Sequence, residues 1–411
     1  MKTGIFISII KDLTNFNYYT SFIICLILNH STYSQSGLTD FQNIEFGKTV
    51  EPSYKSMLDS SKSLSVVESN YLLSVDEMID NIKDKKIVII NEHHEISQNR
   101  IFWRLLARKL YAYGYNKIFI EAILNLDSNY DEHNYVSLKL GNYTNEPTFK
   151  KFLNEVHKKF KIHEYEISFS HSVFLNDSIN NFVKRVSDTF IEKDKAFNLA
   201  GDMSLRDYYQ AINIINQIEP NDKVIIFCGF GHVSTKPKQY WLPLGFWLKY
   251  LYTNSIASID QTTLLGYNFV GSNPNLYNKF SSNFYSILKV NNQYLKEYCD
   301  TIRDIISNVD YTVVTPKVSR ENGRSSWINF FNDSKEVFIE PKKSASYPLT
   351  YYVYNNEDLC YFEEKSLDSS TFPCAYDVLK VDKYVDSIML FVPKSKEYSI
   401  IIRDKYNQIL K

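Results

Sequence analysis

A run of four β-branched apolar residues, Ile-Val-Ile-Ile at positions 87–90, follows a charged segment. A short run that is apolar at every position is typical of a strand buried on both faces of a parallel sheet. From Ser97 onward apolar residues recur at helical spacing, and we interpret Ser97 as the N-cap of that helix. The segment Lys-Ile-Phe-Ile-Glu-Ala at 117–122 predicts a second short, mainly apolar strand, and the apolar run at 224–227 predicts a third. Strand, helix, strand with short turns predicts an α/β fold, a mostly parallel sheet flanked by helices.

The rest of the chain divides into two textures. Beyond about residue 266 long helical periodicity mostly disappears, and short β-like runs rich in Tyr and Val take its place. We therefore predict an α/β catalytic-type domain over residues 71–329 and a small β-rich C-terminal region over residues 330–411 that is dispensable for the site. Further helices are expected at residues 71–85, 147–161, 178–190, 205–218, 241–252 and 292–307, and a further strand at 256–265.

The N-terminus has the pattern of a targeting segment. Residues 22–28 form a short apolar run, and small residues precede Gln35 at the positions that a signal peptidase reads. We predict a signal peptide over residues 1–34 and a linker or arm over residues 35–70. The protein is then exported to the periplasm, the cell surface or the medium. The apolar run is too short to span a bilayer and no later stretch is suitable, so no stable membrane insertion is expected after signal removal.

Charge and cysteine content narrow the classes of function. The 411 residues include 46 Lys and Arg against 47 Asp and Glu. The chain lacks the basic excess of a nucleic-acid binder, so we expect no nucleic-acid partner. Its 5 cysteines are too few for a disulfide framework at this length. An exported protein could still pair Cys360 with Cys374, whereas Cys228 ends a buried strand and fits a small core residue.

Titratable side chains follow three of the predicted strands. Glu92, His93 and His94 come directly after the first strand, Glu121 ends the second, and His232 follows the third. Neighbouring parallel strands end at one edge of a sheet, where open α/β sheets bind ligands. We therefore expect Glu92, His94, Glu121 and His232 to converge, with the two histidines about 5–10 Å apart. Adjacent side chains on an extended segment point oppositely, so His93 should face away.

Other residues near these positions also suggest a role in the site. Arg206 is expected in the first turn of its helix, where a positive charge opposes the helix dipole, and this indicates a purpose beyond helix stability. Gly229 and Gly231 precede His232 and let the backbone turn tightly and approach a ligand.

Two kinds of chemistry fit the constellation. His94, Glu121 and His232 could bind a divalent transition metal that activates water. Alternatively, one histidine and one glutamate could act as a general base on water, while the second histidine and Arg206 stabilise the oxyanion. The spacing does not match the H-E-x-x-H zinc motif, so the metal alternative depends on residue types alone.

The order of these motifs resembles a known superfamily. Asn-Glu-His-His at 91–94, Glu121, Arg206 and Gly-Phe-Gly-His at 229–232 are similar to the pattern G-E-x-H, E, R, G-x-x-H. That pattern belongs to the erythromycin esterase, ChaN-like and TraB-GumN-TIKI proteins, and the similarity covers about residues 83–265. The resemblance implies an α/β sandwich of two related halves that share one cleft. Its leading glycine is Asn91 here, and asparagine tolerates a left-handed turn better than other residues with a side chain.

Three functions are open at this point. The first is an exported hydrolase that acts on an ester or amide of a small molecule or peptide, with Glu92, His94, Glu121, Arg206 and His232 in the cleft. The second is a haem- or metal-binding protein that uses the same histidines, and haem ligation by histidine favours an apolar pocket. The third is a non-catalytic surface protein. Carboxylates accompany both imidazoles, which favours the hydrolase.

Overall fold

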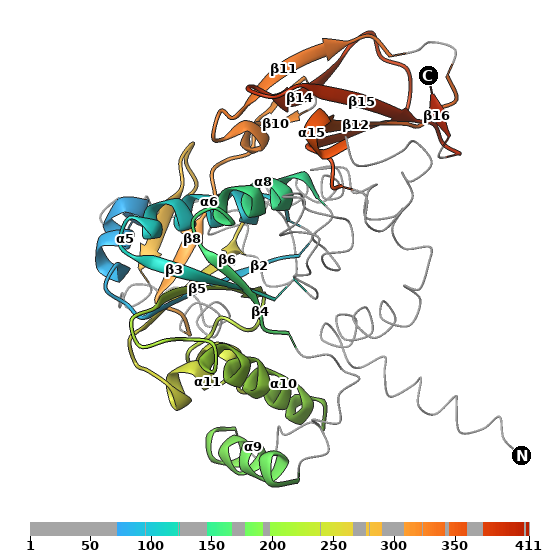
Figure 1. Ribbon diagram of the computed structural model, residues 1–411. Coiled ribbons are helices and arrows are strands. Elements are labelled where there is room, and N and C mark those ends of the chain that lie inside the picture. Colours follow the sequence, from blue (N-terminus) through green and yellow to red (C-terminus); the bar gives the residue numbers. More distant parts are fainter. Residues whose placement is uncertain are drawn as a thin grey trace, which may run out of the picture. The chain divides into compact units, whose positions relative to one another are not determined.

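The computed structural model describes most of the chain beyond residue 71 (Figure 1). The predicted signal peptide, the predicted linker and the helix expected at residues 292–307 lie outside the described residues, as does Cys360. The described residues are 72–94, 96–121, 123, 146–166, 177–191, 198–238, 240–265, 277–278, 280–289, 308–322, 324–341, 345–359, 373–406 and 408–410.

A mostly parallel eight-stranded sheet organises this part of the chain, which confirms the predicted fold class. Strand β2 pairs in parallel with β5 and β6, β5 with β3, β3 with β4, and β6 with β8, while β7 and β1 close one side antiparallel. In pairing order the strands are β1 (Leu72–Leu73), β7 (Ser286–Lys289), β8 (Tyr311–Val314), β6 (Ile256–Leu264), β2 (Ile87–Glu92), β5 (Lys223–Gly229), β3 (Tyr115–Ile120) and β4 (Lys161–Glu164).

The helices cover both faces of the sheet because the central strands are apolar at both parities (Figure 1). Val88 and Ile90 of β2 belong to the core on the side of α5 (Val75–Ile82), α6 (Gln98–Tyr111) and α8 (Pro147–Val156). Ile87 and Ile89 belong to the core on the opposite side, with α9 (Asp177–Phe190), α10 (Asn198–Ile215) and α11 (Leu244–Leu251). The parity of a residue at a strand end therefore decides which helices it meets.

Two helix starts differ from the sequence predictions. Ser97 stands at the N-cap of α6 but has helical φ and ψ and makes no side-chain cap hydrogen bond. Helix α10 begins at Asn198, so Arg206 lies near its middle and not in its first turn. The argument from the helix dipole was therefore wrong, because the field of a helix end fades within one turn. Another cause must explain a charge at Arg206.

The C-terminal region is antiparallel, as expected for a β-rich appendage. Strand β11 (Ser334–Ile339) pairs with β14 (Ile388–Pro393), and a four-stranded sheet has the order β13 (Asp377–Val381), β12 (Leu349–Asn355), β15 (Tyr398–Arg403), β16 (Ile409–Leu410). A short hairpin of β9 (Arg320–Glu321) and β10 (Arg324–Ser325) precedes them, followed by the 3-10 helix η6 (Ser326–Asn329), and α15 (Asn356–Leu359) follows β12. Their inner faces form a core of their own.

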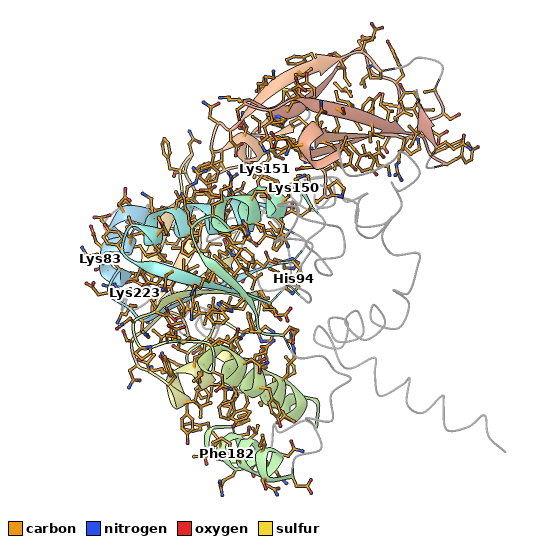
Figure 2. The ribbon with its side chains drawn as sticks, in the orientation of Figure 1. Lys83, His94, Lys150, Lys151, Phe182 and Lys223 are labelled. Atoms are coloured by element: carbon orange, nitrogen blue, oxygen red, sulfur yellow. The ribbon has the colours of Figure 1, made fainter. Side chains whose placement is uncertain are left out.

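Buried polar contacts join this region to Lys150 and Lys151 of α8, which Figure 2 labels. The ammonium of Lys150, fully buried, lies 2.5 Å from Asp358 Oδ2 and donates to the carbonyl oxygen of Cys374. Lys151 donates to Ser334 Oγ at 3.2 Å. The Cys374 thiol is free and buried, and burial raises its pKa to about 12.

In the described part of the chain, no helix has the length and apolarity needed to cross a bilayer.

Candidate active site

The first half of the site is a carboxylate–imidazole pair at the end of β2. Glu92 is the last residue of this strand and is fully buried. Arg100 of α6 donates from Nε to Glu92 Oε2 at 2.8 Å and from Nη2 to Oε1 at 3.0 Å. His94 Nδ1 lies 3.1 Å from Glu92 Oε1. An ionised carboxylate only accepts, so Nδ1 of His94 carries the proton.

The charge of Arg100 keeps Glu92 ionised. Burial alone would raise the pKa of Glu92, but the attraction of Arg100 and the hydrogen bond from His94 outweigh it, and the pKa is lowered. Arg100 is itself fixed by Glu146 at 2.8 Å and by the carbonyl oxygen of His94 at 3.0 Å. Glu146 also accepts from the first backbone N–H groups of α8, so this glutamate joins the helix start to the arginine.

The second half lies on the opposite side of the sheet. Glu121, just after β3, has the parity of the α10 side and accepts from Arg206 Nη2 at 2.6 Å. Arg206 also donates to Glu166, which follows β4, from Nε at 3.1 Å and from Nη2. Arg206 therefore bridges two carboxylates that leave neighbouring strands, and this explains a positive charge in the middle of α10. Burial opposes ionisation of Glu121, but His232, Arg206 and His94 lower its pKa to about 2.

His232 has a hydrogen-bonding partner for either protonation state of its ring. Its Nδ1 lies 2.9 Å from Asp207 Oδ2, so Nδ1 carries a proton, and Asp207 is fully buried. Its Nε2 lies 3.1 Å from Arg206 Nη1 and 3.7 Å from Glu121 Oε1. Neutral His232 accepts from Arg206 at Nε2, whereas the imidazolium offers Nε2–H to Glu121. Burial lowers the pKa of His232, but the charges of Asp207 and Glu121 raise it further than burial lowers it.

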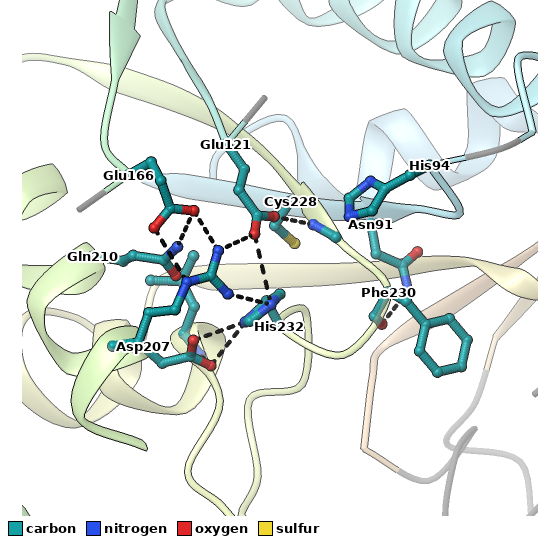
Figure 3. Close-up of polar contacts among 12 residues, drawn as sticks. Asn91, His94, Glu121, Glu166, Asp207, Gln210, Cys228, Phe230 and His232 are labelled. Carbon is teal, nitrogen blue, oxygen red and sulfur yellow. Dashed lines mark hydrogen bonds and ion pairs between the residues drawn. The ribbon is translucent and has the colours of Figure 1, made fainter. Parts of the chain in front are cut away.

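The two halves meet over Gly229, the last residue of β5 (Figure 3). A Cβ on Gly229 would lie 2.9 Å from His94 Cε1 and 3.1 Å from Glu121 Oε2, and its N–H donates to Glu121. Strand β5 runs between β2 and β3, so those strands are not the neighbours that their sequence order suggested. The missing side chain at Gly229 is what lets His94 and Glu121 approach each other across the intervening strand.

The neighbouring asparagine differs from its sequence interpretation. Asn91 lies within β2 in extended conformation, so it does not supply a left-handed turn. Its Nδ2 donates to Asp260 Oδ1 at 2.7 Å and to the carbonyl oxygen of Phe230 at 3.0 Å, and its Oδ1 accepts from Gln261 N at 2.8 Å. Asn91 therefore ties β2 to the end of β6 and to the loop before His232.

The remaining predicted residues have supporting positions. His93 donates its backbone N–H to Asn99 Oδ1 at 2.9 Å, and burial, with the charge of His94, lowers the pKa of its imidazole to about 4. That His93 faces away from the site stays a prediction, as does the separation of His94 and His232. Gly231 gives room to a ring, because a Cβ there would lie 2.8 Å from Trp241 Cζ2.

Several residues of the site were missed from the sequence. Asp207 adjoins Arg206 in the chain, and Gln210 lies one turn further along α10 and donates to Glu166 Oε2 at 3.0 Å. Their helical spacing from Arg206 was the available signal. Glu166 follows a strand as Glu121 does, but β4 is short and half-polar and was not predicted. Arg100 was missed because an arginine is an ordinary residue on the polar face of an amphipathic helix.

The described arrangement does not fit the metal alternative. Among the described residues, no group of three or more His, Cys, Asp and Glu side chains is placed to hold a metal ion. The reason is that the donor atoms already have partners. His232 Nε2 lies 3.1 Å from Arg206 Nη1, and Glu121 receives hydrogen bonds from Arg206 and from Gly229. A metal bound by His94, Glu121 and His232 would have to displace Arg206 from both residues.

Comparisons with known proteins concern the fold. No protein-family model matches the chain, and no curated protein sequence matches it. Solved structures that resemble it include ChaN of Campylobacter jejuni, described with cofacial haem binding, at 14% identity over 60% of this chain and 93% of ChaN, with a TM-score of 0.33. Another is a Bacillus cereus protein at 15% identity over 64% and 96%, with a TM-score of 0.38. Fold and site together define an α/β protein with paired carboxylate–histidine groups at the carboxyl edge of its sheet.

Proposed function

We propose that this site hydrolyses an ester or amide bond. The observation that carries the proposal is the approach, at Gly229, of His94, which pairs with Glu92, to Glu121, which lies 3.7 Å from His232 Nε2, while His232 pairs with Asp207. Each carboxylate holds the proton of its histidine on Nδ1, and each ring is therefore directed to use Nε2 for chemistry. Such orientation by a third group is the usual support of a general base.

The two histidines are suited to opposite proton transfers. His94, paired with Glu92, takes a proton from water at Nε2 while the water oxygen bonds to the carbonyl carbon. Asp207 and Glu121 raise the pKa of His232, so His232 keeps its proton to higher pH than a free imidazole does, and Nε2–H protonates the leaving oxygen or nitrogen as the carbon bond to it breaks. Glu121, between the two rings, carries the negative charge that holds the imidazolium. Arg206 fixes Glu121 and His232.

The substrate class and location follow the sequence expectations. We infer a small-molecule or peptide substrate, and an exported protein if residues 1–34 act as a signal peptide. Membership of the superfamily that contains the erythromycin esterases belongs to the same proposal and depends on the motif order at residues 91–94, 121, 206 and 229–232.

Hydrolysis is tested with a panel of chromogenic acyl esters, amides and peptides. His94→Ala and His232→Ala should each lower kcat/KM roughly 10²–10⁴-fold, the usual contribution of a general acid or base. His157→Ala, at the C-cap of α8, is the matched control and should keep full activity. Unchanged activity after treatment with a chelator would separate this mechanism from a metal-assisted one. If the wild type hydrolyses no member of the panel, the proposal is wrong.

A glycine pair tests the meeting point itself. Gly229→Ala places a Cβ against His94 and Glu121 and should abolish activity, at a stability cost of about 1–3 kcal/mol for overpacking. Gly114 has φ +83° and open space around it. Gly114→Ala should therefore cost about 1–2 kcal/mol of stability through backbone strain and leave activity intact.

A second candidate is haem binding through His94. The His94 side chain is 31% exposed, whereas that of His232 is 11% exposed and enclosed by Asp207, Glu121 and Arg206. An axial ligand needs an accessible imidazole, which His94 offers. Haemin added to the wild type should then give a Soret band that His94→Ala loses. Absence of both hydrolysis and haem binding would favour the third hypothesis, a non-catalytic surface protein.

A further inference from the structure

Lys238, shortly after His232, carries a positive charge in an aromatic setting. Its Nζ lies 4.6 Å from the centroid of the Trp241 ring and 5.8 Å from that of Phe230. Its backbone N–H donates to the carbonyl oxygen of Trp241 at 3.0 Å, so a turn holds the lysine and the tryptophan together. Within the part of the chain that the structure describes, no carboxylate forms an ion pair with this ammonium.

The acidic groups that influence Lys238 are committed to other partners. Asp260 accepts from Asn91 Nδ2 at 2.7 Å, from Thr262 Oγ1 at 2.6 Å and from Thr263 N at 3.1 Å. Asp207 accepts from His232 and from the backbone N–H of Leu244. Burial lowers the pKa of Lys238 to about 8. The charges of Asp260 and Asp207 offset only part of this effect, because they attract the ammonium from a distance. Its charge is therefore incompletely balanced by the chain.

A second donor in the same turn also has no acceptor. The Nε1 atom of Trp241 is buried and has no hydrogen-bond partner among the described residues. A buried polar group without a partner is uncommon, and one explanation is a ligand that supplies the partner. Lys238 and Trp241 both adjoin the peptide directly before His232, since a Cβ on Gly231 would lie 3.5 Å from Lys238 Nζ and 2.8 Å from Trp241 Cζ2.

We propose that Lys238 and Trp241 form a subsite for an anionic oxygen, next to His232. A carboxylate there accepts from the ammonium, and the carbon skeleton attached to it lies against the Trp241 and Phe230 rings. The subsite deepens the proposed function only in naming the substrate class, an ester or amide that also carries a carboxylate. Binding of a carboxylate does not require that the bond be cleaved, so the two proposals can fail separately.

Benzoate and its neutral isostere benzamide are the probes, and calorimetric titration of the full chain is the measurement. We expect wild-type protein to bind benzoate at least about 10-fold more tightly than benzamide, and Lys238→Gln to weaken benzoate about 10–100-fold, as expected for a charge-assisted hydrogen bond. Trp241→Phe retains an aromatic ring, though a smaller one, and removes the N–H, and should weaken benzoate binding by a smaller factor. The exposed Lys236 is the matched control, and Lys236→Gln should bind as the wild type does.

His94→Ala distinguishes the two proposals. This variant should lose hydrolysis and keep benzoate binding. If the wild type binds benzoate but hydrolyses no substrate, the proposed hydrolase function is wrong and the subsite is unaffected. Equal binding of benzoate by Lys238→Gln and Lys236→Gln overturns the subsite, and Lys238 then only balances Asp207 and Asp260. If Lys238→Gln does not fold, the lysine Nζ resonance of the wild type decides the question. That resonance must shift on addition of benzoate and stay in place with benzamide.

Discussion

At the scale of single residues, the two histidines differ in their exposure to solvent and in the charged groups around each ring. His94 is partly exposed and has one carboxylate, Glu92, on its Nδ1 side. His232 is buried among Asp207, Glu121 and Arg206, and two negative charges raise its pKa while Arg206 opposes them. Because the folded-state pKa of His232 lies above its usual value of 6.5, its protonation stabilises the fold. This contribution is fully present below about pH 6.5 and is lost as pH rises through the folded-state pKa.

Asp207→Asn should reduce this pH dependence. The amide can still hydrogen-bond to His232 Nδ1 and Leu244 N, but it lacks the charge that raises the pKa of His232. We expect the loss in free energy of unfolding to be largest near pH 5.5 and to shrink toward pH 9, as measured by urea unfolding at each pH. The alkaline limb of the activity profile should move to lower pH as well, because His232 must be protonated to act as the acid. A stability loss that is the same at every pH would show that Asp207 acts through packing alone.

At the scale of elements, the sequence predicted the central strands and the helices around them well. Their apolar runs are continuous because helices cover both faces, and such runs are easily distinguished from helical periodicity. The order of the strands could not be read in the same way. Strand β5 enters between β2 and β3 after about a hundred intervening residues, and nothing local in its sequence encodes that position. The edge strands β1 and β4, and β7 next to β1, have two to four residues each and too little pattern to detect.

Local sequence patterns likewise predicted only part of the site. Glu92, His94, Glu121 and His232 could be proposed from the sequence because each lies at or just beyond the end of a strongly apolar strand. Asp207 was not, because a buried aspartate on a helix looks like any polar residue of an amphipathic pattern. The predicted start of the helix was also wrong. Helix α10 begins about seven residues before Leu205, the predicted first residue, so Arg206 lies near the middle of the helix and not in its first turn. Tertiary partners, not local sequence, explain both residues.

Asn91 gives a prediction at the scale of elements, because its side chain joins β2, β6 and the loop that carries His232. If Asn91 served only as a turn residue, Asn91→Gly would be tolerated. The hydrogen bonds to Asp260, Gln261 and the Phe230 carbonyl group predict the opposite. Leaving such buried groups without partners should cost about 2–4 kcal/mol of unfolding free energy, at about 1–3 kcal/mol for each group. The exposed Asn216 is the control, and Asn216→Gly should cost less than about 1 kcal/mol.

At the scale of the whole molecule, the question is whether the α/β region folds without the C-terminal region. The sequence predicted that residues 330–411 are dispensable, since they supply no member of the site. The structure places Tyr352, Tyr354 and Ala375 in the same apolar core as Phe149 and Phe152 of α8. Contacts also cross the expected boundary, because Arg324 Nη2 lies 2.5 Å from Asp377 Oδ1. We therefore expect truncation after residue 329 to lower the melting temperature strongly or to abolish cooperative unfolding.

A point substitution makes the same test without removing the region. Lys150 is fully buried on α8 and pairs with Asp358 of α15, so Lys150→Met leaves a buried carboxylate whose one remaining partner among the described residues is Asn355. Breaking a buried pair from one side costs about 3–5 kcal/mol. The exposed pair of Lys396 and Glu357 in the same region is the control, and Lys396→Met should cost less than about 1 kcal/mol. Urea unfolding that shows equal costs for the two variants would mean that the C-terminal region is held to α8 by apolar contacts alone.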